Sequence, residues 1–565
     1  MGERGFRAGL TAYGDAGFSL FHRKVFLKAM GYSEAALDRP VIGIADTRSD
    51  YNSCHANVPQ VVEAVKRGVA MAGGVGFAFP VMSLHEAFAH PTSMFLRNLM
   101  AMEAEEQIRA LPMDAAVLIG GCDKTVPALL MGAISADKPA ILEVTGPMLT
   151  GASRGERVGA CTDCRRFWAA FRAGEMDEGR LAEVNDELGP TIGTCMVMGT
   201  ASTMALCAEA MGAMLPGGAC IPAVHAERLR HAEATGARAV EIARAGGPTL
   251  RQLLTRDALD NALKTLLAAG GSTNAVVHLA AIARRLGLPF DLRELDRLGR
   301  DLPMIVDLKP SGRLYMQELH EAGGFAAIRR ALGERLALDA PTLAGATHRE
   351  LAARDGGFAQ SVVRPAETPI YPSGSIVPLF GGLAPGGAVL KAGAASPHLL
   401  RHEGRAVIFD GLDDLAARID RDDLDVEPED VLVLRGIGPR GAGMPEAGSC
   451  PIPKKLARRG VKDMVRVSDG RMSGTAYGTV ILHVSPEAAE AGPLAKLRPG
   501  DRVRLDVEAR RLDVVAADGG ALEDREPAFT RAGPPPRRGY AALFDREILQ
   551  AEAGCDFRFL GPEGA

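Results

Sequence analysis

The sequence lacks long apolar runs. No stretch approaches the roughly 18 consecutive apolar residues that a membrane-spanning helix needs. The first residues, Met1–Phe6, contain neither the apolar core of a signal peptide nor the Ser or Thr of a myristoylation site. From these absences we expect a cytoplasmic protein that has no membrane partner.

Blocks of like charge are also missing. The 65 Lys and Arg residues against 70 Asp and Glu residues give a formal net charge of -5 over 565 residues, and no basic cluster stands out. A nucleic-acid partner requires concentrated positive charge on one surface. We therefore expect no nucleic-acid partner.

Cysteine is sparse, and its number is odd. Nine cysteines are scattered along the chain, whereas a small secreted disulfide framework carries them in closely spaced pairs. Reduced thiols, metal ligands and core positions are the remaining interpretations. The chain is also too long for one hydrophobic core, so we expect roughly two to four domains.

Apolar strands alternate with helical patterns over the first 150 residues. Val41–Asp46 and Ala115–Ile119 are typical of buried strands, and Val58–Val65 and Met94–Ile108 are typical of helices. This alternation predicts an α/β fold with a mostly parallel sheet covered by helices. A further long helix is expected after Cys195, ending at Met214.

The composition and the predicted secondary structure of the sequence change near residue 365. Four prolines interleaved with Ser and Gly indicate a linker: Pro365, Pro369, Pro372 and Pro378. Short β-like runs follow, including Val431–Leu434, Asp463–Val467, Thr479–Val484 and Arg502–Val507, and helical patterns are sparse until Tyr540–Glu552. We predict an α/β domain over 1–365 and a β-rich, barrel-like domain over 366–565.

Three cysteines occupy equivalent places in the predicted α/β domain. Cys54 and Cys122 follow predicted strands, and Cys195 stands before a predicted helix. Ligands bind beyond the carboxyl ends of strands in open α/β sheets, so the loops that carry these thiols are expected to converge. Asp123 and Lys124 follow Cys122 directly; a tight turn with a buried thiol and a solvated ion pair is the plainer alternative.

Three more segments combine glycine with polar residues. Gly270–Asn274 opens a predicted helix, where its N–H groups could hold a carboxylate or phosphate, although capping alone explains its polar residues. Gly436–Glu446 ends in a carboxylate, and Val467–Thr475 places the hydroxyl of Ser473 between flexible residues. Each of the last two is also compatible with a simple turn.

Taken together, these segments resemble the dihydroxy-acid and sugar-acid dehydratase family. The matching stretches, in order, are Asn52-Ser53-Cys54, Gly121-Cys122-Asp123-Lys124, Gly193-Thr194-Cys195, Gly270-Gly271-Ser272-Thr273-Asn274, Gly443-Met444-Pro445-Glu446 and Ser468-Asp469-Gly470-Arg471-Met472-Ser473-Gly474-Thr475. Six ordered matches over nearly the whole chain are far more specific than any one of them.

The sugar-acid branch of that family, which includes the arabinonate and xylonate dehydratases, looks nearer. The stretches that resemble this branch are Ser83–Glu86, Pro91–Leu99, Arg538–Tyr540 and Gly554–Phe557. Dihydroxy-acid dehydratases carry an aspartate where Glu86 falls. Two features depart from the branch: His85 stands where glycine is expected, and Cys161 and Cys164 add thiols that are not expected.

The resemblance implies a metal-dependent hydro-lyase. It assigns a [2Fe-2S] cluster, or alternatively a [4Fe-4S] cluster, to Cys54, Cys122 and Cys195, with one iron left open as a Lewis acid. It assigns Mg²⁺ to Glu86, Asp123, Glu446 and a carbamylated Lys124, since Mg²⁺ prefers oxygen ligands. The implied ligand residues therefore combine soft and hard donors around Cys122-Asp123-Lys124.

The resemblance also implies a reaction and a base. Ser473 would act as an alkoxide that takes the C2 proton of a C5 or C6 aldonic acid, which yields a 2-keto-3-deoxy acid, and Lys124 would act beside it. His85, Ser272 and Thr475 are further candidates for substrate contacts. Family members are dimers or tetramers, so we expect a homodimer or homotetramer with the site at the domain interface.

Other functions are compatible with parts of the sequence. A dihydroxy-acid dehydratase of branched-chain amino-acid biosynthesis is the nearest alternative. Gly436-x-Gly438-x-x-Gly441 with Asp463 downstream favours an NAD-dependent oxidoreductase, but that fingerprint requires a helix and 442–448 has no helical pattern. A non-catalytic cluster-binding sensor is a further alternative, which would not need Ser473.

The remaining thiols and imidazoles are open to several interpretations. Cys161-x-x-Cys164 is compatible with half of a zinc site, a redox pair or locally structural thiols. His55, His85 and His90 lie near proposed ligands and could orient them, contact substrate or simply pack. Four cysteines are predicted to fill the core: Cys207, Cys220, Cys450 and Cys555.

Overall fold

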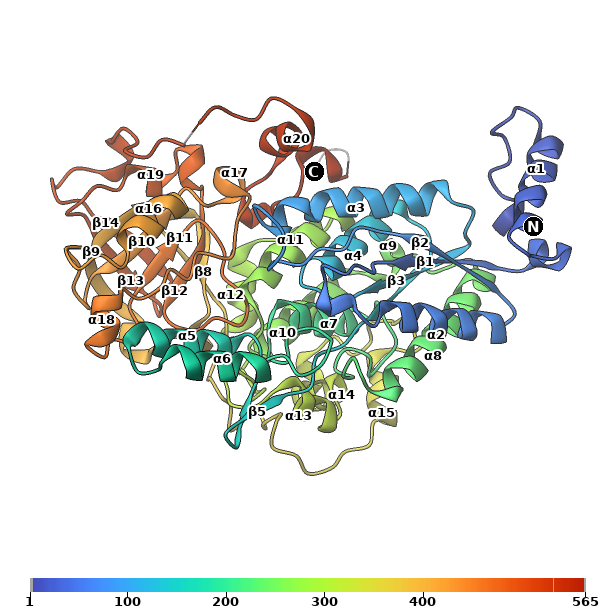
Figure 1. Ribbon diagram of the computed structural model, residues 1–565, viewed down its shortest axis with the longest axis horizontal. Coiled ribbons are helices and arrows are strands. Elements are labelled where there is room, and N and C mark those ends of the chain that lie inside the picture. Colours follow the sequence, from blue (N-terminus) through green and yellow to red (C-terminus); the bar gives the residue numbers. More distant parts are fainter. Residues whose placement is uncertain (1–3, 532, 563–565) are drawn as a thin grey trace.

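Two sheets organise residues 4–531 and 533–562, which are the residues that this computed structural model describes. A four-stranded parallel sheet lies in the N-terminal part, and a closed eight-stranded barrel lies in the C-terminal part (Figure 1). The predicted fold class, a helix-covered parallel sheet followed by a β-barrel, is confirmed. In the described residues, no helix combines the length and the apolar character that crossing a membrane requires.

The N-terminal sheet has the strand order β2-β1-β3-β4. Its strands are β1 (Val41–Asp46), β2 (Val75–Pro80), β3 (Ala115–Gly120) and β4 (Ala140–Val144), and all neighbouring pairs are parallel. Every residue of β3 and β4 is buried. Strands covered on both faces require continuous apolar runs, which explains why β3 is recognisable from its sequence.

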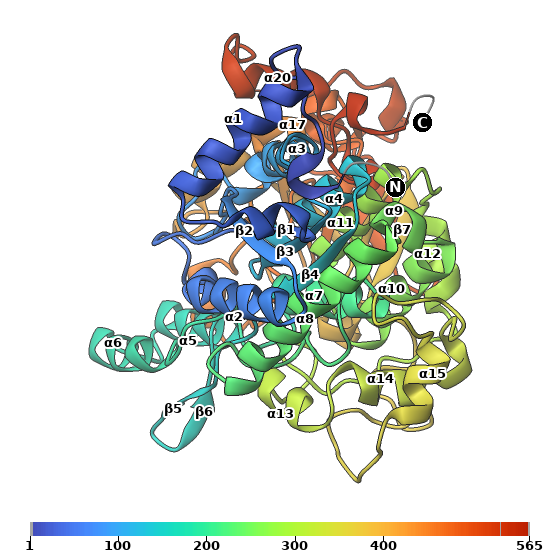
Figure 2. The same cartoon turned by 90° about the vertical axis from the view of Figure 1, so that its right-hand side faces the viewer.

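Helices cover both faces of this sheet. Helices α2 (Val58–Met71) and α8 (Ala226–Ala245) lie on one face, and α3 (Ser93–Ala110) and α4 (Thr125–Ala136) lie on the other (Figures 1 and 2). Glycines let α2 and α8 approach closely: a Cβ on Gly68 would lie 1.8 Å from the carbonyl oxygen of Glu233. Any side chain at this position would force the two helices apart.

The other elements of the N-terminal part surround this core. They are α1 (Ala16–Ala29), β5 (Gly151–Ser153), β6 (Glu156–Val158), α5 (Thr162–Ala173), α6 (Glu178–Glu187), α7 (Thr200–Ala210), α9 (Leu250–Leu253), α10 (Arg256–Ala268), α11 (Thr273–Leu286), α12 (Leu292–Gly299), α13 (Met316–Glu321), α14 (Phe325–Leu332) and α15 (His348–Arg354). Helix α7 is completely buried. Helices α5 and α6 reach from this part toward the barrel (Figure 1).

The barrel closes in the order β10-β11-β12-β8-β7-β14-β13-β9. Its strands are β7 (Val377–Gly381), β8 (Ala384–Leu390), β9 (Arg401–Asp410), β10 (Val431–Arg435), β11 (Arg466–Ser468), β12 (Val480–Ser485), β13 (Arg502–Asp506) and β14 (Arg511–Val515). Its short helices are α16 (Gly411–Arg418), α17 (Pro439–Ala442), α18 (Lys454–Arg458), α19 (Pro493–Lys496) and α20 (Gly539–Glu547). Closure removes exposed strand edges, and inward-facing Leu379, Val433 and Ile481 lie in one apolar cluster.

Several predicted boundaries were wrong. Helix α7 ends at Ala210 rather than Met214, because Gly212 at φ 77° ends the helical turn and Met214 instead pairs with β4. Pro378 lies within β7 and not in the linker. Helix α16 had no predicted counterpart, and the last predicted helix is shorter, since α20 ends at Glu547.

The closing segment of the chain returns to the N-terminal part. Arg285 of α11 donates to both carboxylate oxygens of Asp556, from Nε at 2.6 Å and from Nη2 at 3.0 Å, and both side chains are fully buried. Arg97 of α3 donates to the carbonyl oxygens of Gly554 and Cys555 at 2.9 and 2.7 Å. The C-terminal segment therefore fixes the position of α3 and α11 relative to the barrel.

Replacing Asp556 with Ala is expected to lower the free energy of unfolding by about 3–5 kcal/mol, because the buried Arg285 would lose two charge-assisted hydrogen bonds and keep only Glu105, 3.6 Å away, as a counter-charge. The double variant Arg285→Met with Asp556→Leu should lose less. Urea denaturation followed by circular dichroism measures both. The matched control is Asp423→Ala, whose pair with Arg421 is exposed and should change stability by less than about 1 kcal/mol. Equal effects of Asp556→Ala and the control would contradict this account.

Candidate active site

Hydrogen bonds connect the three loops that carry the predicted cysteine ligands. Nε2 of His55 accepts hydrogen bonds from the backbone N–H groups of Gly121 at 3.0 Å and Cys122 at 3.1 Å. Burial lowers the pKa of His55 to about 4, so the neutral ring that can accept is the stable form. The N–H of Gly193 donates to the carbonyl oxygen of Ser53 at 3.2 Å. The predicted convergence of the Cys54, Cys122 and Cys195 loops has this physical basis.

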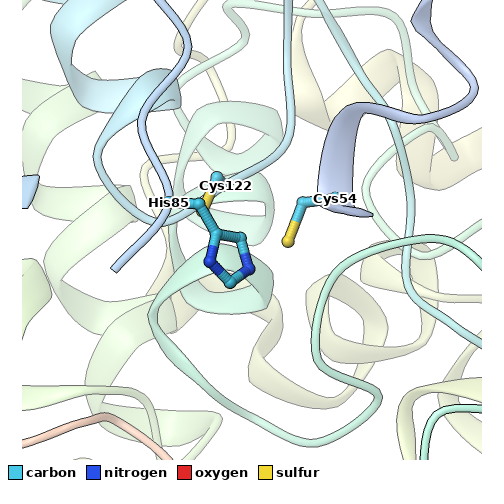
Figure 3. A group of neighbouring side chains, drawn as sticks. All are labelled: Cys54, His85 and Cys122. Carbon is cyan, nitrogen blue, oxygen red and sulfur yellow. The ribbon is translucent and has the colours of Figure 1, made fainter. Parts of the chain in front are cut away.

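Cys54, His85 and Cys122 form a compact group. Their sulfur and ring nitrogen atoms lie within 4.8 Å of one another, and Figure 3 shows the Cys54 sulfur and the His85 ring pointing toward each other. The hydrogen bond with Cys122 lowers the pKa of Cys54 to about 6 although burial opposes it. The same hydrogen bond raises the pKa of Cys122. One thiolate is therefore readily available in this group.

Cys195 lies beside the first thiol of the Cys161-x-x-Cys164 pair. The two sulfur atoms of Cys195 and Cys161 are 3.3 Å apart. The pKa of Cys195 is raised, mainly by the hydrogen bond with Cys161. Burial and the charges of Cys161, Cys54 and Asp123 raise it further. Cys161 is thus part of the same thiol-rich region, which the sequence alone did not predict.

Lys124 lies at the centre of a buried group of charges. Its ammonium is 3.8 Å from Oε2 of Glu86 and 3.8 Å from Oε1 of Glu446, and it pairs with the carboxylate of Asp123. The Lys124 side chain is fully buried at the N-terminus of α4, two residues after Cys122. Glu86 follows β2, whereas Glu446 belongs to the barrel part. The charged group therefore lies where the two parts of the protein meet.

Arg471 joins the two carboxylates from opposite parts. Its Nη2 donates to Oε2 of Glu86 at 2.7 Å, and its Nη1 donates to Glu446. Burial opposes the ionisation of Glu86, but the charges of Arg471 and Lys124 outweigh burial and lower the pKa of Glu86. Burial is the larger effect on Glu446, whose pKa is raised despite the same two cations.

Asn274 and Ser272 lie next to these charges at the start of α11. Nδ2 of Asn274 donates to Oε1 of Glu446 at 3.1 Å, while its Oδ1 is buried and has no hydrogen-bond partner among the described residues. Oγ of Ser272 accepts from the N–H of Asn274 at 3.1 Å and caps the helix. Capping thus accounts for the hydroxyl of Ser272, and its predicted contact with substrate stays a prediction.

Ser473 lies in a turn of the barrel part that packs against the N-terminal part. Its Oγ is 2.9 Å from Oγ1 of Thr475, and the hydroxyl of Thr162 donates to the carbonyl oxygen of Thr475 at 2.9 Å. Gly474 fits tightly, since a Cβ there would lie 2.5 Å from Oγ of Ser272. Ser473 is half-buried whereas Gly474 and Thr475 are buried, so its hydroxyl is the accessible one.

The donor atoms of the site fall into two sets with different metal preferences. Thiol sulfurs are soft ligands and suit iron–sulfur or other soft metal centres, whereas carboxylates suit hard cations such as Mg²⁺. The sets are in contact, because Sγ of Cys122 is 3.5 Å from Oδ1 of Asp123. The carboxylates of Glu86, Asp123 and Glu446 outnumber the two cationic side chains, Lys124 and Arg471. This excess of negative charge and the unpartnered Oδ1 of Asn274 also fit a hard cation.

A cavity of about 590 Å³ lies between α5 and the barrel, and neither Ser473 nor any proposed metal ligand lines it. Its wall includes Ala447, which follows Glu446, and Ala476, which accompanies the Ser473 turn. Arg165 and Lys462 also line it. The volume is within the range of small-molecule sites, and the cations favour anions.

Sequence reasoning placed the main donors but missed the residues that arrange them. It gave no role to Arg471, left His55 undecided and regarded Asn274 only as a possible cap. All three positions lie inside or beside the motifs that were recognised. A signal for Arg471 was present in Ser468–Thr475, where a cation stands two residues before the proposed base. Its partner Glu86 is 385 positions away, so the pairing itself was not visible.

Comparisons with known proteins agree with the resemblance drawn from the motifs. The N-terminal domain of the dihydroxy-acid/6-phosphogluconate dehydratases matches residues 39–351, and the C-terminal domain matches 361–555. An L-arabonate dehydratase of Azospirillum brasilense is 47% identical over 96% of this chain and 95% of its own. A 6-deoxy-6-sulfo-D-gluconate dehydratase of Pseudomonas putida is 42% identical over 93% and 91%. A dihydroxy-acid dehydratase of Caldanaerobacter subterraneus is 36% identical over 95% and 97%.

The short distance between Cys161 and Cys195 predicts a disulfide in the metal-free chain under oxidation. Diamide, a diazene oxidant, should take two electrons and two protons from these thiols as the S–S bond forms, since the two sulfurs are already 3.3 Å apart. Peptide mapping by mass spectrometry detects the linked peptides. Cys161→Ser should abolish this link, whereas Cys207→Ala, at a distant buried thiol, should not. Failure to form the link in the metal-free wild type would show that the two sulfurs do not approach in solution.

Proposed function

The chain belongs to the dihydroxy-acid/6-phosphogluconate dehydratase family, and on that premise we propose that it removes water from a C5 or C6 sugar acid to give a 2-keto-3-deoxy acid. The observation that carries the proposal is the meeting of thiols, carboxylates and the Ser473 turn at the junction of the two parts. Relatives named for sugar acids are 42–47% identical, which favours this substrate class over branched-chain dihydroxy acids.

We propose that Cys54, Cys122 and Cys195 hold a [2Fe-2S] cluster or, alternatively, a [4Fe-4S] cluster. When bound, this group supplies a Lewis acid for the departing C3 hydroxyl, since three thiolates leave one iron with an open position. His55 fixes the direction of the Cys122 thiol by accepting its N–H. Support comes from the soft donor set and from the hydrogen bonds between the three loops.

We propose that Glu86, Asp123, Glu446 and a carbamylated Lys124 hold Mg²⁺. When bound, this cation offsets the negative charge on the substrate carboxylate and C2 hydroxyl. Arg471 keeps Glu86 ionised and orients Glu446, so the oxygen atoms are ready to bind a cation. The unpartnered Oδ1 of Asn274 adds another oxygen beside Glu446.

Ser473 is proposed as the base that removes the C2 proton. In its alkoxide form its Oγ takes the C2 proton, and the electron pair of the C2–H bond forms the C2–C3 double bond. The hydroxide that leaves C3 takes this proton from Ser473 and becomes water, which restores the alkoxide, and the enol then tautomerises to the keto acid. The hydroxyl of Thr475, 2.9 Å away, can donate to the deprotonated oxygen and stabilise it. His85 lies beside the thiols, where it can contact the departing group.

Two other interpretations have less support. The Gly436-x-Gly438-x-x-Gly441 segment opens only α17, a four-residue helix that ends before Gly443 at φ 72°, so it lacks the helix that a dinucleotide fingerprint requires. A dihydroxy-acid dehydratase is the second candidate, because relatives of that name are about 36% identical over nearly the whole chain. A homodimer or homotetramer in the cytoplasm completes the proposal.

The substrate class is tested with protein purified anaerobically and supplied with iron, sulfide and Mg²⁺. A panel of C5 and C6 aldonic acids is assayed for 2-keto-3-deoxy product, with 2,3-dihydroxy-3-methylbutanoate as the comparison. We expect a higher kcat/KM for at least one aldonic acid. Preference for the branched-chain acid would move the protein to the second candidate, and no product from any substrate by a cluster-loaded protein would exclude a dehydratase.

The roles of the thiols and the serine are separable by spectroscopy. Cys122→Ser should lose the visible chromophore, whereas Ser473→Ala should keep it and lose roughly 10²–10⁴-fold in kcat, the usual contribution of a general base. Absorption and EPR spectra with steady-state kinetics measure both. Cys207→Ala and Ser373→Ala are the matched controls outside the site. A fully coloured Cys122→Ser or a fully active Ser473→Ala would remove the corresponding role.

A further inference from the structure

Lys391 is a buried cation for which the reaction described above has no role. It is the residue after the last residue of strand β8, and its side chain is fully buried. Among the described residues its Nζ has one hydrogen-bond acceptor, the carbonyl oxygen of Gly474 at 3.2 Å, and no carboxylate within 4.0 Å. Burial alone accounts for its lowered pKa, about 7. The amine therefore exchanges between charged and neutral forms near neutral pH, and its protonated form has no counter-charge within 4.0 Å among the described residues.

The single acceptor of Lys391 belongs to the turn that carries Ser473. Three successive carbonyl oxygens of this turn are held by different donors. The N–H of Ala476 donates to the carbonyl oxygen of Ser473 at 3.0 Å, Lys391 donates to that of Gly474, and the hydroxyl of Thr162 donates to that of Thr475. Lys391 is the only charged group of the three donors. It therefore contributes both to the geometry of the turn and to the electrostatic potential around it.

The turn has little freedom on its other side. A Cβ on Gly474 would lie 2.5 Å from Oγ of Ser272 and 2.8 Å from the backbone nitrogen of Thr200, so the peptide is pressed against the start of two helices of the N-terminal part. Lys391 holds the same peptide from the barrel side. The carbonyl oxygen of Gly474 accepts from Lys391, and the Ser473 hydroxyl lies 2.9 Å from that of Thr475.

We propose that Lys391 is a positioning residue for Ser473, which holds the catalytic turn through the Gly474 carbonyl and, in its protonated form, adds a positive charge to that turn. The inference rests on the proposed role of Ser473. A buried cation near a hydroxyl favours its deprotonated form, because the alkoxide supplies the missing counter-charge. The Nζ of Lys391 makes no hydrogen bond to a proposed metal ligand among the described residues, so we expect it to act through the turn.

The test compares Lys391→Met, which keeps the length of the side chain, with Lys391→Arg, which keeps the charge. We expect Lys391→Met to lower kcat roughly 10- to 100-fold, part of what a general base contributes, with KM and the cluster spectrum nearly unchanged. Lys391→Arg should retain more activity. Lys496→Met, a lysine of the same part outside the site, should behave like the wild type. Unchanged kcat in Lys391→Met would overturn the proposal.

A double-mutant cycle separates positioning from general damage to the fold. In a Ser473→Ala background, Lys391→Met should cause little further loss, because its effect passes through the serine. An equal loss in both backgrounds would show a merely structural role and overturn the proposal.

Amide hydrogen exchange gives a reading that does not depend on activity. Peptides covering 473–476 should exchange faster in Lys391→Met than in the wild type, while peptides of β10 should not change. Unchanged exchange in the turn of Lys391→Met would contradict the positioning role of Lys391, whether or not the wild type is active. A wild type that dehydrates none of the sugar acids would contradict only the proposed function.

Discussion

The structure depends on the burial of charges at the junction between the helix-covered sheet and the barrel. Glu86 comes from the sheet side, Glu446 and Arg471 come from the barrel side, and Lys124 lies between them. Neither side is balanced alone: Arg471 from the barrel part helps to keep the buried Glu86 ionised, and without Glu86 and Glu446 the buried Arg471 would lose both carboxylates to which it donates. Breaking such a pair from one side is far more costly than replacing both partners, so the two parts are fixed together electrostatically.

This constraint explains why the site is built from distant segments. Within the N-terminal part, two hydrogen bonds hold the backbone around the thiols. His55 accepts from the N–H of Cys122, and the N–H of Gly193 donates to the carbonyl oxygen of Ser53. The barrel then adds a hydroxyl, from Ser473, and a carboxylate, from Glu446. The proposed base and the proposed metal ligands therefore lie on separate parts of the protein, which can hold them at a defined distance without relying on one flexible loop. The tight fit of Gly474 against the N-terminal part is consistent with this arrangement.

Much of this arrangement could be predicted because local sequence determines it. The run Ala115–Ile119 is apolar throughout since β3 is covered on both faces, and that fixes the place of Cys122 at the carboxyl end of a strand. Ser272 caps α11 as its sequence suggests. Pairings over long separations could not be predicted, because no local pattern encodes that Arg471 meets Glu86 or that Cys161 meets Cys195. The end of α7 was misplaced because a single Gly212 outweighs an apolar pattern that continues to Met214.

The charge balance at the junction links two proposed features of the oxygen-ligand group, namely Mg²⁺ binding and the carbamylation of Lys124. With an ammonium on Lys124, three carboxylates face two cations, and the group carries a net charge of about one negative unit. Carbamylation of Lys124 replaces that positive charge with a negative one and would leave about three negative units in a buried region, which is strongly unfavourable. Mg²⁺ restores the original balance. Carbamylation without the cation is therefore disfavoured, and binding of the cation beside a lysine ammonium is disfavoured by repulsion. The proposed carbamylation and the proposed cation binding therefore favour each other.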